Sequence, residues 1–230
     1  MNVALIAAAG IGRRMGGQGK QYLLLGGEPM LAHTLRAFES CSAVQQIVVA
    51  AGGEDLGRCR ELVKHYKFNK VRQVVEGGRE RQDSIYNGLR ALPEQTKVVA
   101  VHDGARPFVT SAVIEDCFSG LDGWDGVIAG VPAKDTLKRI EGEKVVETLD
   151  RQDIWQIQTP QVFPADLLVK AYKKAGSDGF YGTDDAVLME RLGYRIRIIM
   201  GSYENIKITT PDDVVIAEAI LEKRKKTVER

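Results

Sequence analysis

Val3-Ala4-Leu5-Ile6-Ala7-Ala8 is an apolar run that leads, through Ala9, into Gly10-Ile11-Gly12. An unbroken apolar run closed by glycines is typical of a strand buried on both faces of a parallel sheet. Glycine has no Cβ atom, so backbone amides just after such a strand can approach a ligand closely. The opening of the chain therefore predicts a buried first strand and a loop beyond its carboxyl end.

This loop allows two interpretations. Arg13, Arg14 and Lys20 lie in it or just beyond it, and backbone donors combined with fixed cations make a site for a polyphosphate. The same residues are also compatible with a tight strand-to-helix turn that carries solvated cations. Two nucleotide motifs are excluded, because Met15 stands where a dinucleotide fingerprint needs glycine and Gln21 follows Lys20 where a Walker A loop needs Ser or Thr.

Strand and helix patterns alternate through the first half of the chain. One helix is predicted to begin at Pro29, a second to end near Tyr66, and a third to carry Ile85 and Leu89. Strands are predicted at residues 46–50, 71–75, 98–101 and 126–131. This alternation predicts an α/β fold with a Rossmann-like, doubly wound, mostly parallel sheet. Ligands bind beyond the carboxyl ends of the strands in such sheets, which is where we expect the loops at Gly10, Gly77–Gly78 and Asp103.

The alternation stops after residue 131. Residues 136–140 and 145–149 read as two strands around Glu141-Gly142-Glu143, a hairpin with few apolar residues of its own. An isolated two-stranded hairpin is only marginally stable in water. We therefore expect it to pack against another surface, either its own domain or a second copy of the chain.

The last third of the chain returns to an alternating pattern. A helix is predicted from Pro164, with Thr183-Asp184-Asp185 as the N-cap and acidic first turn of a second helix. A strand is predicted at residues 195–200, followed by a short strand at Asn205–Thr209 that contains Lys207 and by a helix from Pro211.

Length and composition limit the classes of protein. A chain of 230 residues, 44% hydrophobic and 27% charged, is the size of one α/β domain, so we expect a single domain over residues 1–230. The net charge of +1 gives no field that would attract nucleic acid or a membrane surface. The cysteines Cys41, Cys59 and Cys117 are far apart, which is typical of reduced thiols in a cytoplasmic protein.

Few side chains stand out as candidates for chemistry. Asp103 ends a buried strand and is either a ligand for Mg²⁺, which needs only one or two protein carboxylates, or the cap of the following turn. Arg14, Lys20 and Lys207 suit a phosphoryl centre, because transfer at phosphorus depends on positioning and charge stabilisation. Spacing alone, however, favours Lys207 as an ordinary exposed strand lysine. His102 is expected to pack against the strand end.

The motifs together resemble a known family. They are Ala7–Met15 with Lys20-Gln21-Tyr22, Gly77-Gly78 with Arg81 and Asp83-Ser84, residues 101–107, Asp135-Thr136, Thr159-Pro160-Gln161 and Asn205-Ile206-Lys207. The first is similar to the signature loop of the nucleotidylyltransferases. From Met1 to the C-terminal helix, the chain resembles the 2-C-methyl-D-erythritol 4-phosphate cytidylyltransferases of the non-mevalonate isoprenoid pathway.

The resemblance implies a function and a set of site residues. It implies transfer of CMP from CTP to 2-C-methyl-D-erythritol 4-phosphate with release of pyrophosphate, catalysed by Arg14, Lys20 and Lys207, with Mg²⁺ or another divalent cation at Asp103. CTP is expected to contact Ala8, Ala9, Gly10, Gly12, Gly78, Ser84 and Gly104. The polyol phosphate is expected to contact Arg106, Thr136, Arg151, Thr183 and Lys207. Arg151 would do so from the β-hairpin arm at about residues 134–153, across the interface of a homodimer.

Three alternatives remain at this point. A cytidylyltransferase for another polyol phosphate, such as ribitol 5-phosphate, shares much of this constellation. A non-catalytic nucleotide-binding domain has no need for Arg14, Lys20, Asp103 and Lys207 together, and a dinucleotide-dependent oxidoreductase is disfavoured by the incomplete glycine fingerprint. Ala7 and Gly104 depart from the family, which often has Pro and Ala at these positions, but neither change removes a functional side chain.

Overall fold

The computed structural model describes residues 1–10 and 19–228 of the chain. Its helices are α1 (Met30–Ser40), α2 (Leu56–His65), α3 (Arg81–Arg90), α4 (Ser111–Ser119), α5 (Ala165–Ser177), α6 (Ala186–Glu190) and α7 (Pro211–Val228). Its strands are β1 (Asn2–Ala8), β2 (Leu24–Leu25), β3 (Glu28–Pro29), β4 (Gln46–Ala51), β5 (Val71–Glu76), β6 (Val98–Asp103), β7 (Gly126–Pro132), β8 (Lys138–Glu141), β9 (Lys144–Thr148), β10 (Trp155–Pro164) and β11 (Ile196–Met200).

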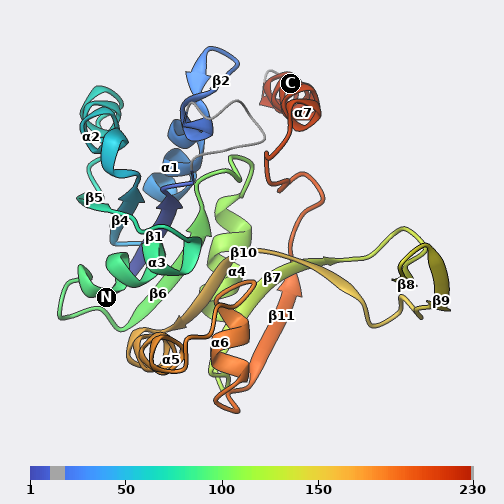
Figure 1. Cartoon of the computed structure of the whole chain (residues 1–230). Coiled ribbons are helices and arrows are strands. Elements are labelled where there is room, and N and C mark those ends of the chain that lie inside the picture. The colour runs from blue at the N-terminus through green and yellow to red at the C-terminus, as the bar shows by residue number, and fades with distance from the viewer. Residues whose placement is uncertain (11–18, 229–230) are drawn as a thin grey trace.

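A mostly parallel sheet forms the centre of the molecule. Seven strands of the described chain make it, in the order β11-β7-β10-β6-β1-β4-β5 (Figure 1). β10 runs antiparallel to both of its neighbours, β6 and β7, whereas the other neighbouring pairs are parallel. The predicted α/β class with a doubly wound, mostly parallel sheet is confirmed.

The sheet is covered by helices on both faces because its strands are apolar on both faces. Successive side chains of a strand point to opposite faces, and in β1 Ala4 and Ile6 join one core cluster while Val3 and Leu5 join the other. The first cluster is completed by apolar residues of α1, α2 and α4. The second is completed by residues of α3, α5 and α6. A continuous apolar run is therefore what a doubly covered strand requires.

The order of the strands places a crevice beside β1. The chain passes from β1 outward to β4 and β5 and then returns to β6 on the other side of β1. β1 and β6 are parallel neighbours, and Ala7 pairs with Asp103 at their carboxyl ends. Strand order reverses at this point, and open α/β sheets bind ligands at such a reversal.

A third apolar cluster attaches α7 to the same edge of the sheet. Ile208 and Ala217 pack with Leu25 of β2, with Met30 at the start of α1 and with Phe108. The prediction of a short strand at Asn205–Thr209 is wrong, because this segment belongs to no strand. Ile208 is instead tied to Ala105 by a backbone hydrogen bond of 2.9 Å from its amide to the Ala105 carbonyl.

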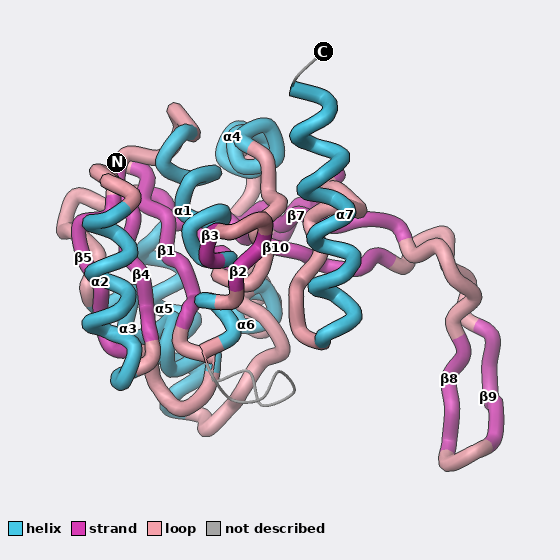
Figure 2. The backbone as a smooth tube through the Cα atoms, turned by 90° about the horizontal axis from the view of Figure 1, so that it is seen from above, coloured by secondary structure: helices cyan, strands magenta, loops and turns pink. Residues whose placement is uncertain are grey.

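The predicted hairpin is present as β8 and β9. It extends away from the sheet as an arm, and the two views agree on this (Figures 1 and 2). Each residue of β8 and of β9 is exposed. Within this chain, the alternative in which the hairpin packs on its own domain is therefore wrong.

The sequence interpretation missed β10, a strand of the sheet centre. Pro160 lies within it, and proline normally argues against a central strand because it lacks the amide that the ladder needs. The pairing of β10 with β7 shifts register between Ile157 and Gln161, so the proline falls in the irregularity. Such bulges are common beside functional sites.

Among the described residues, no helix has the length and apolar character needed to cross a membrane.

Candidate active site

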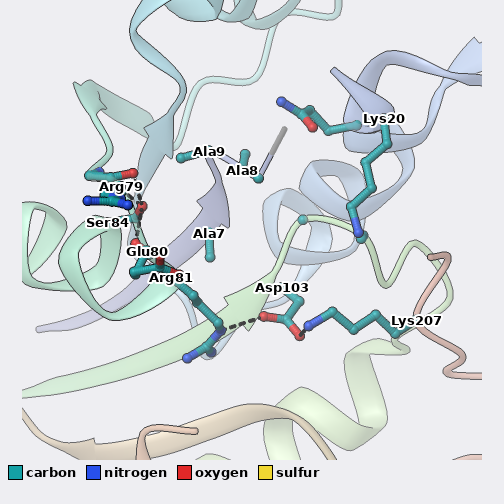
Figure 3. Close-up of a pocket in the computed structure, with 15 residues that line it drawn as sticks. Ala7, Ala8, Ala9, Lys20, Arg79, Glu80, Arg81, Ser84, Asp103 and Lys207 are labelled. Atoms are coloured by element: carbon teal, nitrogen blue, oxygen red, sulfur yellow. Dashed lines mark hydrogen bonds and ion pairs between the residues drawn. The ribbon is translucent and has the colours of Figure 1, made fainter. Parts of the chain in front are cut away.

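Two adjoining cavities lie at the carboxyl edge of the sheet. The first, of about 380 Å³, is lined by Ala7–Gly10, Lys20, Gln21, Gly78–Arg81, Ser84, Asp103–Ala105 and Lys207. The second, of about 310 Å³, is lined by Arg81, Asp103, Arg106, Ile157–Thr159, Gln161, Thr183, Asp184 and Lys207. Arg81, Asp103 and Lys207 line both, so these three side chains form the boundary between the cavities. Figure 3 shows them at the first cavity, with Asp103 between Arg81 and Lys207.

The floor of the first cavity is built by close backbone approach. The Gly104 amide donates to the Ala7 carbonyl at 2.9 Å and joins the ends of β6 and β1. A Cβ at Gly77 would lie 2.3 Å from the Cβ of Ala9, so only glycine lets the β5–α3 loop approach the β1 loop this closely. Ser84 then fixes this second loop, because its hydroxyl accepts from the Gly78 amide at 3.0 Å and donates to the Glu80 carbonyl at 3.0 Å.

The Asp103 carboxylate is the centre of the charge distribution. Oδ1 accepts from Arg81 Nε at 2.9 Å, and Oδ2 lies 2.8 Å from Lys207 Nζ and 3.7 Å from Arg106 Nε. Burial would raise the pKa of this carboxyl, but the charges of Arg81 and Lys207 outweigh burial and hold the pKa well below its usual range. Asp103 is therefore an anion at any physiological pH.

Lys20 brings a further cation to this region. It begins a short 3₁₀ turn, η2 (Lys20–Tyr22), and its Nζ donates to the Ile208 carbonyl at 3.2 Å. Ile208 directly follows Lys207, so the two lysines, which are 187 positions apart in the chain, reach the same side of the first cavity (Figure 3). Four cations, Lys20, Arg81, Arg106 and Lys207, thus surround Asp103 and the boundary of the cavities, an arrangement that suits anionic ligands.

His102 supports the site from below and does not face either cavity. It is fully buried, and its two ring nitrogens lie 3.1 Å from the Arg106 carbonyl and 3.0 Å from Thr159 Oγ1. The carbonyl can only accept, so Nε2 carries the proton and Nδ1 accepts from the Thr159 hydroxyl. Thr159 Oγ1 in turn accepts from the Asp103 amide at 3.1 Å. The expectation that His102 packs against the strand end is confirmed.

The structure brings most of the predicted site residues together. Lys20, Lys207, Asp103, Ala8, Ala9, Gly10, Gly78, Ser84 and Gly104 line the first cavity, and Arg106 and Thr183 line the second. Thr136 and Arg151 lie near the base of the arm, where both are exposed and line neither cavity. Gly12 and Arg14 lie outside the described residues, so the roles expected of them stay predictions.

Several residues at the site were not predicted to have a role. Arg81 and Asp185 form a buried ion pair, with Arg81 Nη2 2.7 Å from Asp185 Oδ2. The sequence predicts Asp184 and Asp185 as the acidic first turn of a helix. The structure corrects this: Asp184 Oδ1 accepts from the Val187 amide at 3.1 Å and caps α6, Thr183 does not cap it, and Asp185 is the fully buried counter-ion of Arg81. The position of Arg81, three residues after the Gly77-Gly78 loop, was the sequence signal that could have predicted its place at the site.

The donor set is compatible with one magnesium ion shared with a ligand. In the described part of the chain, no group of three or more His, Cys, Asp and Glu side chains is arranged to hold a metal ion. Magnesium, however, commonly takes one or two protein carboxylates and obtains its other ligands from phosphates and water. Asp103, a carboxylate at the wall of both cavities, fits that requirement.

Comparison with known proteins identifies the family. Residues 2–223 match the family model described as 2-C-methyl-D-erythritol 4-phosphate cytidylyltransferase. The chain belongs to this family. A protein of Geotalea uraniireducens with the family name is 48% identical over 222 residues, which cover 95% of each chain. One from Halalkalibacterium halodurans is 45% identical over 223 residues, covering 96% of this chain and 97% of the relative.

Solved structures of cytidylyltransferase relatives share the fold. The crystal structure of 4-diphosphocytidyl-2C-methyl-D-erythritol synthase from Anaerococcus prevotii matches with a TM-score of 0.88 and 31% identity, covering 96% of both chains. The 2-C-methyl-D-erythritol 4-phosphate cytidylyltransferase of Thermus thermophilus matches with a TM-score of 0.78 and 30% identity, covering 96% of this chain and 98% of the other. The likeness therefore extends over almost the whole chain.

The buried state of His102 predicts a stability that depends on pH. Burial lowers the imidazole pKa to about 4 and outweighs the hydrogen bond to the Arg106 carbonyl and the charge of Asp103, which both raise it; the charges of Arg106 and Arg81 lower it further. The unfolded histidine, with a pKa of about 6.5, binds a proton in a range where the folded one does not. Its contribution is therefore complete above pH 6.5 and is lost as pH falls toward 4. The free energy of unfolding should drop by about 2 kcal/mol from this group between pH 7 and pH 4.5.

Urea denaturation at several pH values measures this effect. In His102→Gln the drop between pH 7 and pH 4.5 should be smaller than in the wild type by about 2 kcal/mol, whatever the variant's stability at pH 7. Curves that stay parallel for the two proteins over this range would contradict the assignment.

Proposed function

We propose that this chain transfers the cytidylyl group of CTP to 2-C-methyl-D-erythritol 4-phosphate and releases pyrophosphate. Family membership over residues 2–223 supports the reaction. The observation that carries the proposal is the pair of cavities that share Arg81, Asp103 and Lys207. Two anionic substrates whose phosphates must meet require two adjoining compartments with cations at the boundary.

Each cavity fits one substrate. The first is lined by the backbone of the glycine-containing loops after β1 and β5 and by Lys20. This combination suits a nucleoside triphosphate. The second has Arg106, Thr183 and Lys207, a combination of cations and a hydroxyl that suits a small polyol phosphate. We assign CTP to the first cavity and the acceptor to the second.

The chemistry is an in-line displacement at phosphorus. A phosphate oxygen of the acceptor forms a bond to the α-phosphorus of CTP, and the bond from that phosphorus to the bridging oxygen of pyrophosphate breaks. A phosphate monoester is largely dianionic near neutral pH because its second pKa is about 6, so the nucleophile needs no general base. This agrees with the placement of His102 beneath the site and away from both cavities.

The protein's part is to position the phosphates and to offset charge. Lys207 and Lys20 stabilise the negative charge at the α-phosphorus and on the departing pyrophosphate. Arg14, outside the described residues, is proposed from the family resemblance to share this role. Asp103 would hold Mg²⁺, or another divalent cation, which when bound supplies further charge neutralisation at the phosphates. Arg106 and Thr183 orient the acceptor.

We further propose that the arm joins two copies of the chain. Its exposed apolar side chains, Ile140, Val145 and Val146, are 50%, 53% and 40% exposed, which supports a covered surface in an assembly. Arg151 near the base of the arm and Thr136 would then act on the acceptor of the partner subunit. Such an exchange would give these two residues the role that neither cavity of one chain offers them.

A cytoplasmic location follows from the same proposal. Cys41, Cys59 and Cys117 are free and buried, and burial raises the pKa of the Cys59 thiol to about 11 and that of Cys117 to about 12. Thiols of this kind are inert structural residues, and their free state supports a reducing compartment.

Comparison of acceptors tests the reaction. Pyrophosphate release from CTP should be fast with 2-C-methyl-D-erythritol 4-phosphate and near background with ribitol 5-phosphate, at equal concentrations and with Mg²⁺ present. Equal or faster release with ribitol 5-phosphate would contradict the acceptor. CTP binding without release in the presence of either acceptor would indicate a non-catalytic nucleotide-binding domain.

The two described lysines should be needed for turnover and not for folding. Removing one preorganised charge donor costs about 3 kcal/mol in the transition state, so Lys20→Gln and Lys207→Gln should each lower kcat at least about a hundredfold. Lys64→Gln, an exposed lysine of α2, is the matched control and should leave kcat unchanged. Either site variant with near-normal kcat would remove that lysine from the mechanism.

The arm should control assembly. A dimer with two-fold symmetry would bury Ile140 twice, and each isoleucine contributes about 1.5–3 kcal/mol. Ile140→Lys should therefore raise the dimer dissociation constant at least about a hundredfold, as measured by sedimentation equilibrium. Glu143→Lys, in the exposed turn of the arm, is the control. A dimer dissociation constant in Ile140→Lys equal to that of Glu143→Lys and of the wild type would show that the arm does not form the interface.

A further inference from the structure

The Arg81 guanidinium bridges two carboxylates that belong to different parts of the chain. Its Nε donates to Asp103 Oδ1 at 2.9 Å. Its Nη1 and Nη2 donate to the two oxygens of Asp185 at 3.1 and 2.7 Å. Both terminal nitrogens of the guanidinium therefore bind Asp185, and only Nε binds Asp103. Figure 3 shows the Arg81–Asp103 contact.

Asp185 is a buried carboxyl group that is surrounded by hydrogen-bond donors. It is fully buried, and Oδ1 also accepts from the hydroxyl of Tyr172, itself 3% exposed. Its amide and that of Ala186 donate to Gln161 Oε1 at 3.1 and 3.0 Å, which fixes the start of α6 against β10. A buried carboxylate with this many donors is a rigid anchor for Arg81.

The two oxygens of Asp103 are consequently not equivalent. Oδ1 is held by Arg81, whose side chain is 27% exposed and is anchored at its other end. Oδ2 is hydrogen-bonded at 2.8 Å to Lys207, which is 38% exposed and lies on an irregular segment outside any strand or helix. Arg106 Nε lies 3.7 Å from Oδ2, beyond hydrogen-bond distance, and so leaves that oxygen accessible once Lys207 moves. Lys207 is also the residue expected to turn to a phosphate, so Oδ2 is the oxygen that can be released.

We propose that Arg81 and Asp185 are positioning residues which keep Oδ1 of Asp103 occupied and present Oδ2 alone to the divalent cation. The inference rests on the proposed function, which places that cation at Asp103. Asp185 matters because it neutralises the charge of Arg81. Without it, the full guanidinium charge would act on Asp103 and compete with the cation for the carboxylate.

The predicted consequence is a change in metal affinity when the bridge is altered. Lysine keeps the charge of arginine but is a point charge without a planar fork, so Arg81→Lys cannot hold both carboxylates in the same way. Loss of a partner that orients a metal ligand typically weakens metal binding by about 10–100-fold. Tyr172→Phe, which removes one donor from Asp185, should weaken it less.

Manganese binding tests the proposal without any turnover. Mn²⁺ is titrated into the full-length protein saturated with a non-reactive CTP analogue, with no acceptor present, and the enzyme-bound ion is followed by electron paramagnetic resonance. Arg81→Lys should bind Mn²⁺ about 10–100-fold more weakly than the wild type, with both proteins compared at saturating analogue so that a change in nucleotide affinity does not enter the comparison. Arg90→Lys, at the exposed end of the same helix, is the matched control and should bind Mn²⁺ normally.

Turnover and folding are read separately. Thermal unfolding identifies a variant that has lost its fold, and if Arg81→Lys is such a variant, Tyr172→Phe carries the test. Excess Mg²⁺ should restore most of the kcat of the weakened variant, which a general structural defect would not allow. Wild-type affinity for Mn²⁺ in folded Arg81→Lys, or in folded Tyr172→Phe when it stands in, would overturn the proposal. Failure of the wild type to release pyrophosphate would instead overturn the proposed function and leave the metal measurement valid.

Discussion

The structure of the site depends on one buried carboxylate held among cations. Asp103 ends β6 at the point where strand order reverses, and Arg81, Lys207 and Arg106 approach it from α3, from the segment before α7 and from the turn after β6. A buried charge is tolerated only when partners compensate it. Three segments far apart in the sequence are therefore brought to one point, and the two cavities share that point as their boundary.

The fold supplies the rigidity that this arrangement needs. Asp103 is fixed through its backbone as well as its side chain: its amide donates to Thr159, Thr159 to His102, and His102 to the Arg106 carbonyl, which closes the turn that follows the strand. Arg81 is anchored through Asp185 to α6 and, through Gln161, to β10. Positioning of phosphates within a fraction of an ångström has a large effect on phosphoryl transfer, and these contacts all lie on regular elements or next to them.

The sequence alone predicted much of this, for identifiable physical reasons. The apolar run at residues 3–8 is typical of a doubly buried strand, and the carboxyl ends of parallel strands share an edge. Ala8–Gly10, Gly77–Gly78 and Asp103 were therefore correctly placed together. The pairing of Arg81 with Asp185 could not be predicted, because 104 positions separate them and each has an ordinary role in its own segment, as a helix-start arginine and as an acid of a first turn. β10 was not predicted because Pro160 argues against a central strand. The alternating Ile206 and Ile208 suggested a strand, although in the structure they pack against α7. In each case a tertiary contact overrode a local pattern.

In the proposed reaction, nucleotide and acceptor occupy separate cavities and meet across Asp103. A crystal structure of the protein with Mn²⁺, a non-reactive CTP analogue and 2-C-methyl-D-erythritol 4-phosphate tests it most directly, because anomalous scattering locates the metal independently of the ligands. We expect the nucleotide against Ala8–Gly10 and Gly78, the acceptor against Arg106 and Thr183, and the metal at Asp103 with the α-phosphate facing Lys207. An acceptor bound away from the second cavity, or a metal remote from Asp103, would contradict it.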